Sequence, residues 1–290
     1  MLAHQKIISE RMAKKYPRQR VKSLRGYAVE MIGREDARKM IEEYEWLGTF
    51  GKSTTFIGLV SPERELHGVA CFGWGPGGYI RKKIGARQHQ NDDGELALCL
   101  ERGACVHYAP PNAASFLING ACRLICRCTS TSIFFAYADP MAGEYGGVYQ
   151  AAGWSYLGQG LMGVKKKKDE NGNIKELKVI QRPRRIFVLA PGLDPNNHTN
   201  WQTSRVLRQG GRDLGFDEAR KLGWTIASRE AKHVYATSFG QRRKQWCKEH
   251  PSLDYPAPRP ELKLRTNKVF RVAAPVPPQY SIFDNELYIS

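Results

Sequence analysis

The sequence contains no long apolar run. No stretch approaches the ~20 consecutive apolar residues that a membrane-spanning helix needs. The N-terminal stretch MLAHQKIISERMAKKYPRQR also lacks the apolar middle and the small-residue cleavage site of a secretory signal. We therefore expect a cytoplasmic protein with no membrane partner.

Cysteine is present, but without the spacing of a zinc site. The seven cysteines are an odd number, and most lie in apolar segments, which is typical of reduced, buried thiols. Cys122, Cys126 and Cys128 lie close together, yet there is no CxxC pair and no matching histidine pair downstream. We expect these three residues to pack on one helix rather than to bind zinc.

Acidic residues are scarce relative to basic ones. The chain has 28 Asp and Glu against 45 Lys and Arg, which gives a net charge of +17 over 290 residues. The excess is spread through the chain and favours a polyanionic partner, most commonly nucleic acid. The alternative is a basic protein whose charge confers only solubility.

The periodicity of apolar residues and the positions of glycine and proline predict an α/β (α+β) fold, with a mixed sheet flanked by helices. Residues 1–25 form a basic N-terminal arm, read as a mobile arm or an accessory helix, and residues 77–94 read as a polar loop. The expected strands are 26–32, 53–61, 66–75, 95–106, 132–140 and 155–168; the expected helices are 33–48, 110–128 and 143–154.

The later segments read as peripheral to this sheet. A basic hairpin is expected around the DENGN turn, and residues 190–215 look like an irregular connection. Residues 217–250 combine a helical start, a strand near HVYATSF and a basic helix. We expect four parts: the arm (1–25), a catalytic core (26–165), a basic hairpin and DNA-binding extension (166–260), and an extended C-terminal tail (261–290).

Three segments carry a family resemblance. The element order, with a tyrosine four residues before the Gly–aromatic pair in VYQAAGW, resembles the GNAT acyltransferase superfamily. More narrowly, CLERGACVHYAPPNAASFLINGACRL followed by YADPMAGEYGGVYQAAGWSYLGQG resembles the phage Mom-type proteins. KHVYATSFGQRRKQW followed by DYPAPRP is similar to that family's closing segment. The resemblance implies that the mixed sheet is GNAT-like. It also implies a GNAT-like transferase, with an anti-restriction role, that adds a carbamoylmethyl-like group to adenine N6 in DNA, in the host cytoplasm.

Asp139 is the first acidic residue after an apolar strand. Strands of an open α/β sheet deliver side chains into the crevice at their C-terminal ends, so this carboxylate is a candidate for handling the target amine. The alternative is a turn or capping aspartate before Pro140.

Tyr149 and Ser115 are the other candidate catalytic residues. The resemblance places Tyr149 where many GNAT enzymes protonate a departing thiolate; otherwise it is an ordinary half-buried aromatic. Ser115 lies in the first turn of a helix whose free N–H groups favour an anion, with Asn112 as the candidate N-cap. Arg102 is a candidate cation for a phosphate or carboxylate, or a partner of Glu101.

Two departures leave the donor and any metal open. HYAPPNAAS replaces the usual glycine-rich cofactor loop and includes two prolines without N–H groups, so acetyl-CoA or a related acyl donor is only one candidate. Some Mom relatives have a His-Tyr pair, with a suggested metal role, where this chain has Glu45 and Trp46. These two are candidates for metal binding or base stacking, with packing at a helix end as the alternative.

An enzyme that acts on a base in duplex DNA must extrude the nucleotide, at a cost of a few kcal/mol. Phosphate contacts offset that cost. The candidate DNA-binding residues are Lys165, Lys166, Lys167, Lys168, Arg182, Arg184, Arg185, Arg242, Arg243 and Lys244.

Two other functions fit the same residues. One is an N-acyltransferase or amino-acid transferase that acts on a small amine, a protein or a hypermodified thymidine. The other is a nucleic-acid-binding protein without catalysis. Binding to coenzyme A, or unchanged nucleosides despite salt-dependent DNA binding, would distinguish them.

Overall fold

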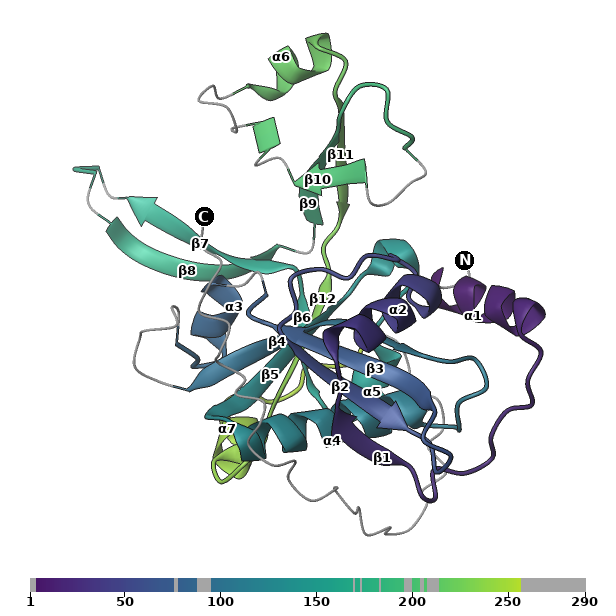
Figure 1. The fold of residues 1–290 in the computed structure, drawn as a ribbon. Coiled ribbons are helices and arrows are strands. Elements are labelled where there is room, and N and C mark those ends of the chain that lie inside the picture. Colours follow the sequence, from purple (N-terminus) through teal and green to yellow (C-terminus); the bar gives the residue numbers. More distant parts are fainter. Residues whose placement is uncertain are drawn as a thin grey trace. The chain divides into compact units, whose positions relative to one another are not determined.

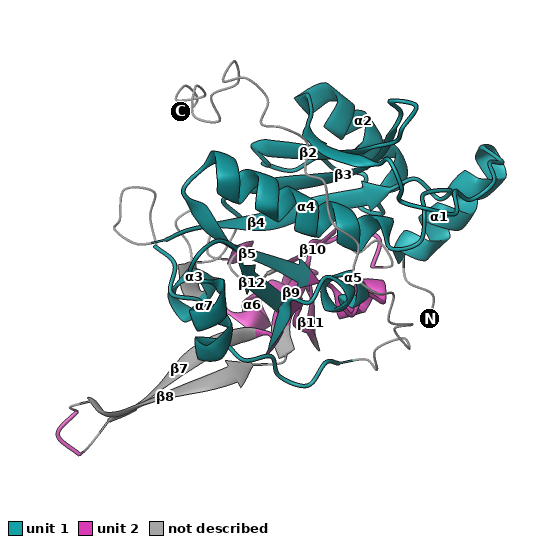
Figure 2. Cartoon of the chain, turned by 90° about the horizontal axis from the view of Figure 1, so that it is seen from below, with its two compact units in different colours: residues 1–137, 146–157, 235–290 teal, residues 138–145, 158–234 magenta. Residues whose placement is uncertain are grey.

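A computed structural model of the chain describes residues 4–75, 78–87, 95–168, 170–172, 174–182, 184–195, 200–203, 206–207 and 214–256. The chain forms two compact units (Figure 2). Unit 1 comprises residues 1–137, 146–157 and 235–290, and unit 2 comprises residues 138–145 and 158–234. The predicted C-terminal tail, residues 261–290, lies outside the described residues.

A seven-stranded mixed sheet forms the centre of the fold (Figure 1). Its strands, in spatial order, are β1 (Ala28–Met31), β2 (Thr55–Val60), β3 (Leu66–Gly73), β4 (Leu96–Cys105), β5 (Thr131–Ala138), β12 (His233–Ser238) and β6 (Ser155–Gln159). The pairs from β1 to β4 are antiparallel, whereas β4 and β5 are parallel. The sheet and its flanking helices confirm the predicted α/β class.

Helices α2 (Arg34–Tyr44) and α4 (Ala113–Cys128) pack on the two faces of these strands (Figure 1). In α2 the buried positions recur at helical spacing, and Glu35 and Asp36 in the first turn favour the helix start. In α4 the buried Gly120 lets the helix approach Val29 of β1 closely. Cys122 is buried in this helix, as expected, whereas Cys128 is exposed.

Further helical elements are α1 (His4–Lys15), α3 (Gly78–Lys83), η1 (Pro140–Ala142), α5 (Gly147–Ala151) and α7 (Arg243–Glu249). Helix α1 gives the N-terminal arm the form of an accessory helix. Helix α3 corrects the loop that we predicted over 77–94. Ile80, Arg81 and Ile84 are buried there, and Arg81 donates to the carbonyls of Ala97 (2.7 Å) and Trp74.

Strands β4 and β5 separate before they end. Their register pairs run from Leu96–Thr131 to Leu100–Ala136. Beyond Leu100, β4 continues only beside β3, after a register shift between Cys71 and Phe72. Because parallel strands end at the same edge of a sheet, the loop to α4 and the residue that follows β5 leave from this edge.

The predicted strand 155–168 is in fact two strands. β6 joins the main sheet, whereas β7 (Leu161–Lys168) pairs antiparallel with β8 (Ile174–Arg182) and confirms the predicted hairpin. The break falls at Gly160, whose φ of +87° suits glycine. The Gly160 N–H donates to the Lys232 carbonyl at 2.9 Å, so the start and finish of the intervening segment lie together.

Two later segments also differ from the prediction. The strand near HVYATSF is not peripheral: it forms β12, whose six residues are all buried between β5 and β6. Residues 184–230 include a three-stranded sheet of β9 (Arg184–Leu189), β10 (Trp201–Thr203) and β11 (Thr225–Glu230), with helix α6 (Phe216–Lys221). Val188, Leu207 and Ala219 form a small buried core among the described residues of this part.

Gly120→Ala tests the close approach of α4 to the sheet. An added Cβ would lie 2.7 Å from Val29 Cγ2, so overpacking outweighs the gain in helix propensity. We expect the free energy of unfolding to fall by about 1–2 kcal/mol in urea titrations. Gly147→Ala is the matched control, because an added Cβ there meets nothing within 4 Å. Equal stabilities for the two variants would contradict the packing argument.

Candidate active site

Asp139 directly follows β5 and is held by two contacts. Its Oδ1 accepts a hydrogen bond from the Met141 N–H at 3.0 Å, which caps η1. Its Oδ2 lies 3.3 Å from Lys232 Nζ, and 20% of the side chain remains exposed. The capping role that we gave as the alternative is therefore present. The second oxygen pairs with a lysine, and the side chain as a whole remains partly exposed.

His233 and Tyr145 extend this group within unit 2. His233 begins β12, is 4% exposed, and has its ring centroid 5.6 Å from that of Tyr145. Burial lowers the pKa of His233, while the charges of Glu230 and Asp139 oppose that shift. We call Asp139, Tyr145, Lys232 and His233 the Asp139 cluster. It combines a carboxylate, an ammonium, an imidazole and a phenol, which are groups that can accept, donate and relay a proton.

Tyr149 belongs to an aromatic cluster in unit 1. Its ring centroid lies 5.3 Å from that of Trp154 and 5.2 Å from that of Tyr235. Trp154 and Tyr235 are fully buried, whereas Tyr149 is half-buried. Tyr149 thus packs against two buried aromatic rings. Asp139 and Tyr149 fall in different units, so their joint action stays a prediction.

Gly146 leaves room for the Tyr235 ring beside Tyr149, and Gln150 bonds the Tyr235 hydroxyl. Gly146 has a φ of +75°, and a Cβ at this position would collide with the Tyr235 ring. The Tyr235 hydroxyl also accepts a hydrogen bond from Gln150 Nε2 at 3.4 Å. The C-terminal segment packs on the same cluster, where the Tyr255 hydroxyl donates to the Trp154 carbonyl at 2.9 Å.

Asn112 and Ser115 lie where α4 begins. Asn112 occupies the predicted N-cap position, but its backbone is left-handed (φ 64°) and its side chain makes no capping hydrogen bond. Ser115 Oγ donates to the Asn112 carbonyl at 3.1 Å. Ser115 therefore bonds the cap residue and remains half-buried at the helix start, where a donor's anionic part is predicted.

Arg102 braces a neighbouring loop. Its Nε donates to the Thr49 carbonyl at 2.7 Å, and its Nη1 donates to the Glu101 carbonyl at 2.7 Å. The Glu101 carboxylate instead accepts from Ser53 Oγ at 2.9 Å. The predicted partnership between Arg102 and Glu101 thus runs through the backbone, and a role in binding an anion stays a prediction.

Glu45 and Trp46 pack where α2 ends. Glu45 is the C-cap, is 8% exposed, and its Oε2 accepts from the Leu47 N–H at 2.9 Å. The backbone N–H of Trp46 donates to Gln5 Oε1 at 3.2 Å, and the ring of His4 meets the Trp46 indole edge-on. In the described part of the chain, no group of three or more His, Cys, Asp or Glu is placed to hold a metal ion.

The predicted DNA-binding residues are only partly described. The side chains of Lys165, Lys166, Lys167, Lys168, Arg182, Arg184 and Arg185 lie outside the described structure. At the start of α7, Arg242 Nη1 pairs with Glu95 Oε1 at 3.0 Å, Arg243 lies over the Phe239 ring, and Lys244 is exposed.

Lys232 and His233 were not predicted from the sequence. Lys232 precedes an apolar strand and His233 begins it, and nothing local in the sequence connects them with Asp139. The sequence did offer one signal: a basic residue and a titratable residue stand together where an apolar strand begins, just as an acidic residue stands where β5 ends. The placement of β12 beside β5 is what joins them.

The lowered pKa of His233 makes a pH prediction. The folded chain binds this proton less readily than the unfolded chain, so stability is full above about 6.5 and falls as the pH decreases below it. His233→Asn should flatten the pH dependence of the free energy of unfolding below about pH 6.5. Urea titrations and NMR titration of the imidazole check this. An imidazole midpoint at or above the usual histidine value would contradict it.

Among the described residues, every helix is too short or too polar to span a membrane.

The comparisons with known proteins place the chain in a family. No curated protein matches the sequence. The sequence model of the Mom protein family matches residues 26–191, more than half of the 290 residues. The chain therefore belongs to the Mom protein family, a family associated with phage DNA modification.

Proposed function

We propose that the protein is a transferase that adds a small, carbamoylmethyl-like group to the exocyclic amine of adenine in DNA. The family match spans Arg102, Ser115, Asp139 and Tyr149. The observation that carries the proposal is the Asp139 carboxylate, oriented by the Met141 amide and by Lys232 and still partly exposed. A fixed, partly exposed carboxylate is what an amine needs as proton acceptor.

Asp139 acts on the nucleophile. The lone pair of an adenine amine is delocalised into the ring, so the amine attacks poorly unless its proton is removed as the bond forms. In the proposed step, the amine nitrogen bonds to the donor's electrophilic carbon and its proton moves to Asp139. Lys232 holds the carboxylate in one orientation, and His233 is close enough for its pKa to respond to the Asp139 charge.

The donor is handled by residues of unit 1. The bond from the donor's carbon to its leaving group breaks, and the electron pair departs with that group. Tyr149 gives the leaving group a proton, because a phenol remains protonated at neutral pH. Ser115, Asn112 and the first turn of α4 bind the donor's anionic part, with Arg102 as a supporting cation.

Basic residues supply the affinity for DNA. Removing a nucleotide from the stack costs a few kcal/mol, which phosphate contacts offset. The hairpin lysines and the residues at the start of α7 are the proposed contacts, and they bind double-stranded DNA while its target base is flipped out.

Asp139→Asn tests the catalytic assignment. The amide keeps the size of the side chain but cannot accept the amine proton, so base modification should disappear while DNA affinity stays within about twofold. Mass spectrometry of nucleosides from expressing cells measures modification, and fluorescence anisotropy measures binding. Asp217→Asn is the matched control, since this aspartate of the same unit is 93% exposed.

Each outcome separates the candidates. Full modification by Asp139→Asn would remove Asp139 from the mechanism. Unchanged nucleosides with the wild-type protein, together with salt-dependent DNA binding, would instead identify a binding protein without catalysis. A mass increment on the wild-type nucleoside identifies both the base and the added group.

Replacing the hairpin lysines, Lys165 to Lys168, with glutamine tests the DNA contacts. Each phosphate contact contributes about 0.9 to the slope of log K against log salt, so the slope should fall by up to about 4. The matched control replaces four exposed lysines elsewhere: Lys39, Lys52, Lys221 and Lys248. Equal slopes for the two quadruple variants would mean that only net charge matters.

A further inference from the structure

The chain that follows α1 lies along the loop that leads into α4. We call residues 16–22 the arm segment and residues 106–112 the β4–α4 loop. The Val21 N–H donates to the Tyr108 carbonyl at 2.8 Å, and Arg20 Nε donates to the Ala109 carbonyl at 3.2 Å. Arg18 Nη1 donates to the Tyr108 hydroxyl at 3.0 Å. Three successive contacts therefore join the two segments.

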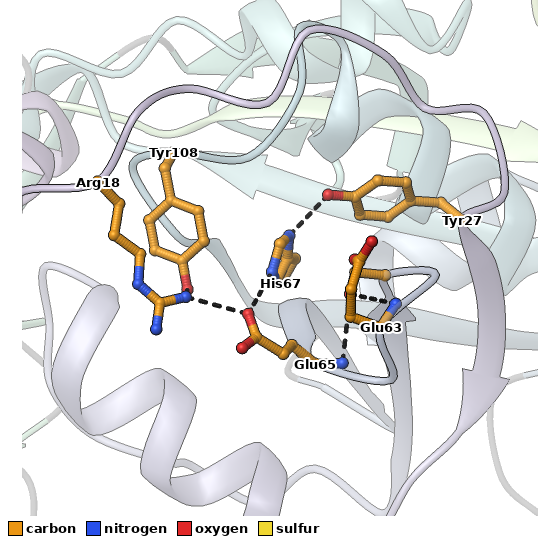
Figure 3. A network of polar contacts seen from close by, with 7 residues as sticks. Arg18, Tyr27, Glu63, Glu65, His67 and Tyr108 are labelled. Carbon is orange, nitrogen blue, oxygen red and sulfur yellow. Dashed lines mark hydrogen bonds and ion pairs between the residues drawn. The ribbon is translucent and has the colours of Figure 1, made fainter.

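Arg18 is also anchored to the turn between β2 and β3 (Figure 3). Its Nη1 lies 3.0 Å from Glu65 Oε2, and the same oxygen lies 3.2 Å from His67 Nε2. His67 Nδ1 in turn shares a hydrogen bond with the Tyr27 hydroxyl at 2.7 Å. The contacts to His67 and Arg18 lower the pKa of Glu65. A continuous polar chain thus runs from Tyr27 to Tyr108.

His67 supports the loop from the other side. It is 3% exposed, and its carbonyl accepts a hydrogen bond from the Val106 N–H at 3.0 Å. Its ring meets that of Tyr108 edge-on, with centroids 5.0 Å apart. Tyr108 is therefore held between the buried His67 ring and the Arg18 guanidinium, which lies 4.9 Å from the tyrosine ring centroid.

These external contacts add to the few hydrogen bonds that the β4–α4 loop makes for itself, such as the one from the Ala109 N–H to the Val106 carbonyl at 3.0 Å. Pro110 and Pro111 have no N–H, which limits the hydrogen bonds that the loop can make for itself. The loop ends at Asn112, whose backbone is left-handed (φ 64°), a conformation that is uncommon for residues other than glycine. Contacts with the surrounding structure help to hold such a conformation.

We propose that the arm segment fixes the β4–α4 loop, and that Arg18 is a positioning residue for the start of α4. Arg18 acts through Tyr108 and Glu65 and touches no substrate. Its consequence for the reaction rests on the proposed function, in which Ser115 and the first turn of α4 bind the donor. A loose loop would displace that turn without unfolding the protein.

The experiment compares Arg18→Ala with Arg25→Ala in the full-length chain. Arg25 is an exposed arginine of the same arm whose side chain contacts neither Glu65 nor Tyr108, so both variants lose one positive charge. Hydrogen exchange with mass spectrometry should show several-fold faster exchange for Val21, Ala109 and Ala113 only in Arg18→Ala. Arg18→Lys keeps the charge opposite Glu65 and should recover part of the protection.

Activity gives the second readout. Misplacing a binding group by about 1 Å costs up to ~100-fold, so the fraction of modified nucleoside should fall at least about tenfold in Arg18→Ala. The urea midpoint and DNA affinity should match those of Arg25→Ala, which a general loss of structure would not allow.

Equal exchange in the two variants would overturn the proposal, and so would wild-type modification by an Arg18→Ala protein with a loosened loop. A wild-type chain that modifies no nucleoside would defeat the proposed function instead. In that case the exchange comparison still decides whether Arg18 holds the loop.

Discussion

The separation of β4 from β5 is the constraint on which the rest of the structure depends. The two parallel strands pair as far as Leu100 and Ala136, and then β4 continues beside β3 alone. One strand leads to the β4–α4 loop, which ends at Asn112 and is followed by Ser115 in the first turn of α4. The other leads to Asp139. The candidate donor-binding and amine-handling residues thus follow adjacent strands, as is general for open α/β sheets.

One buried charged residue, Arg81, links several elements of unit 1. Arg81 is fully buried, has carbonyl acceptors in Trp74 and Ala97, and lies with its guanidinium 3.5 Å from the Trp74 ring centroid. Burial lowers its pKa to about 10, so it remains protonated at neutral pH. This buried cation, with two carbonyl acceptors and an aromatic face beside it, ties α3 to β4 and to the residue that follows β3.

The sequence predicted what local patterns determine. Helices α2 and α4, the β2–β3 hairpin and the β7–β8 hairpin follow from periodicity and turn residues, and Asp139 from its place after an apolar strand. The position of β12 could not be predicted, because a buried strand looks the same at the edge of a fold as at its centre. Lys232, His233 and the Arg18 network went unrecognised for the same reason: their partners are distant in sequence.

The hydrogen bond between Gly160 and Lys232 has a consequence for how the family can diversify. The chain leaves the main sheet after β6 and returns to it at β12. The hydrogen bond joins the residue just before this intervening segment, residues 161–231, to the residue just after it. Because its two ends are joined, insertions or deletions inside this segment can leave β6 and β12 in register. A change in the length of this segment therefore need not disturb the pairing of β6 with β12.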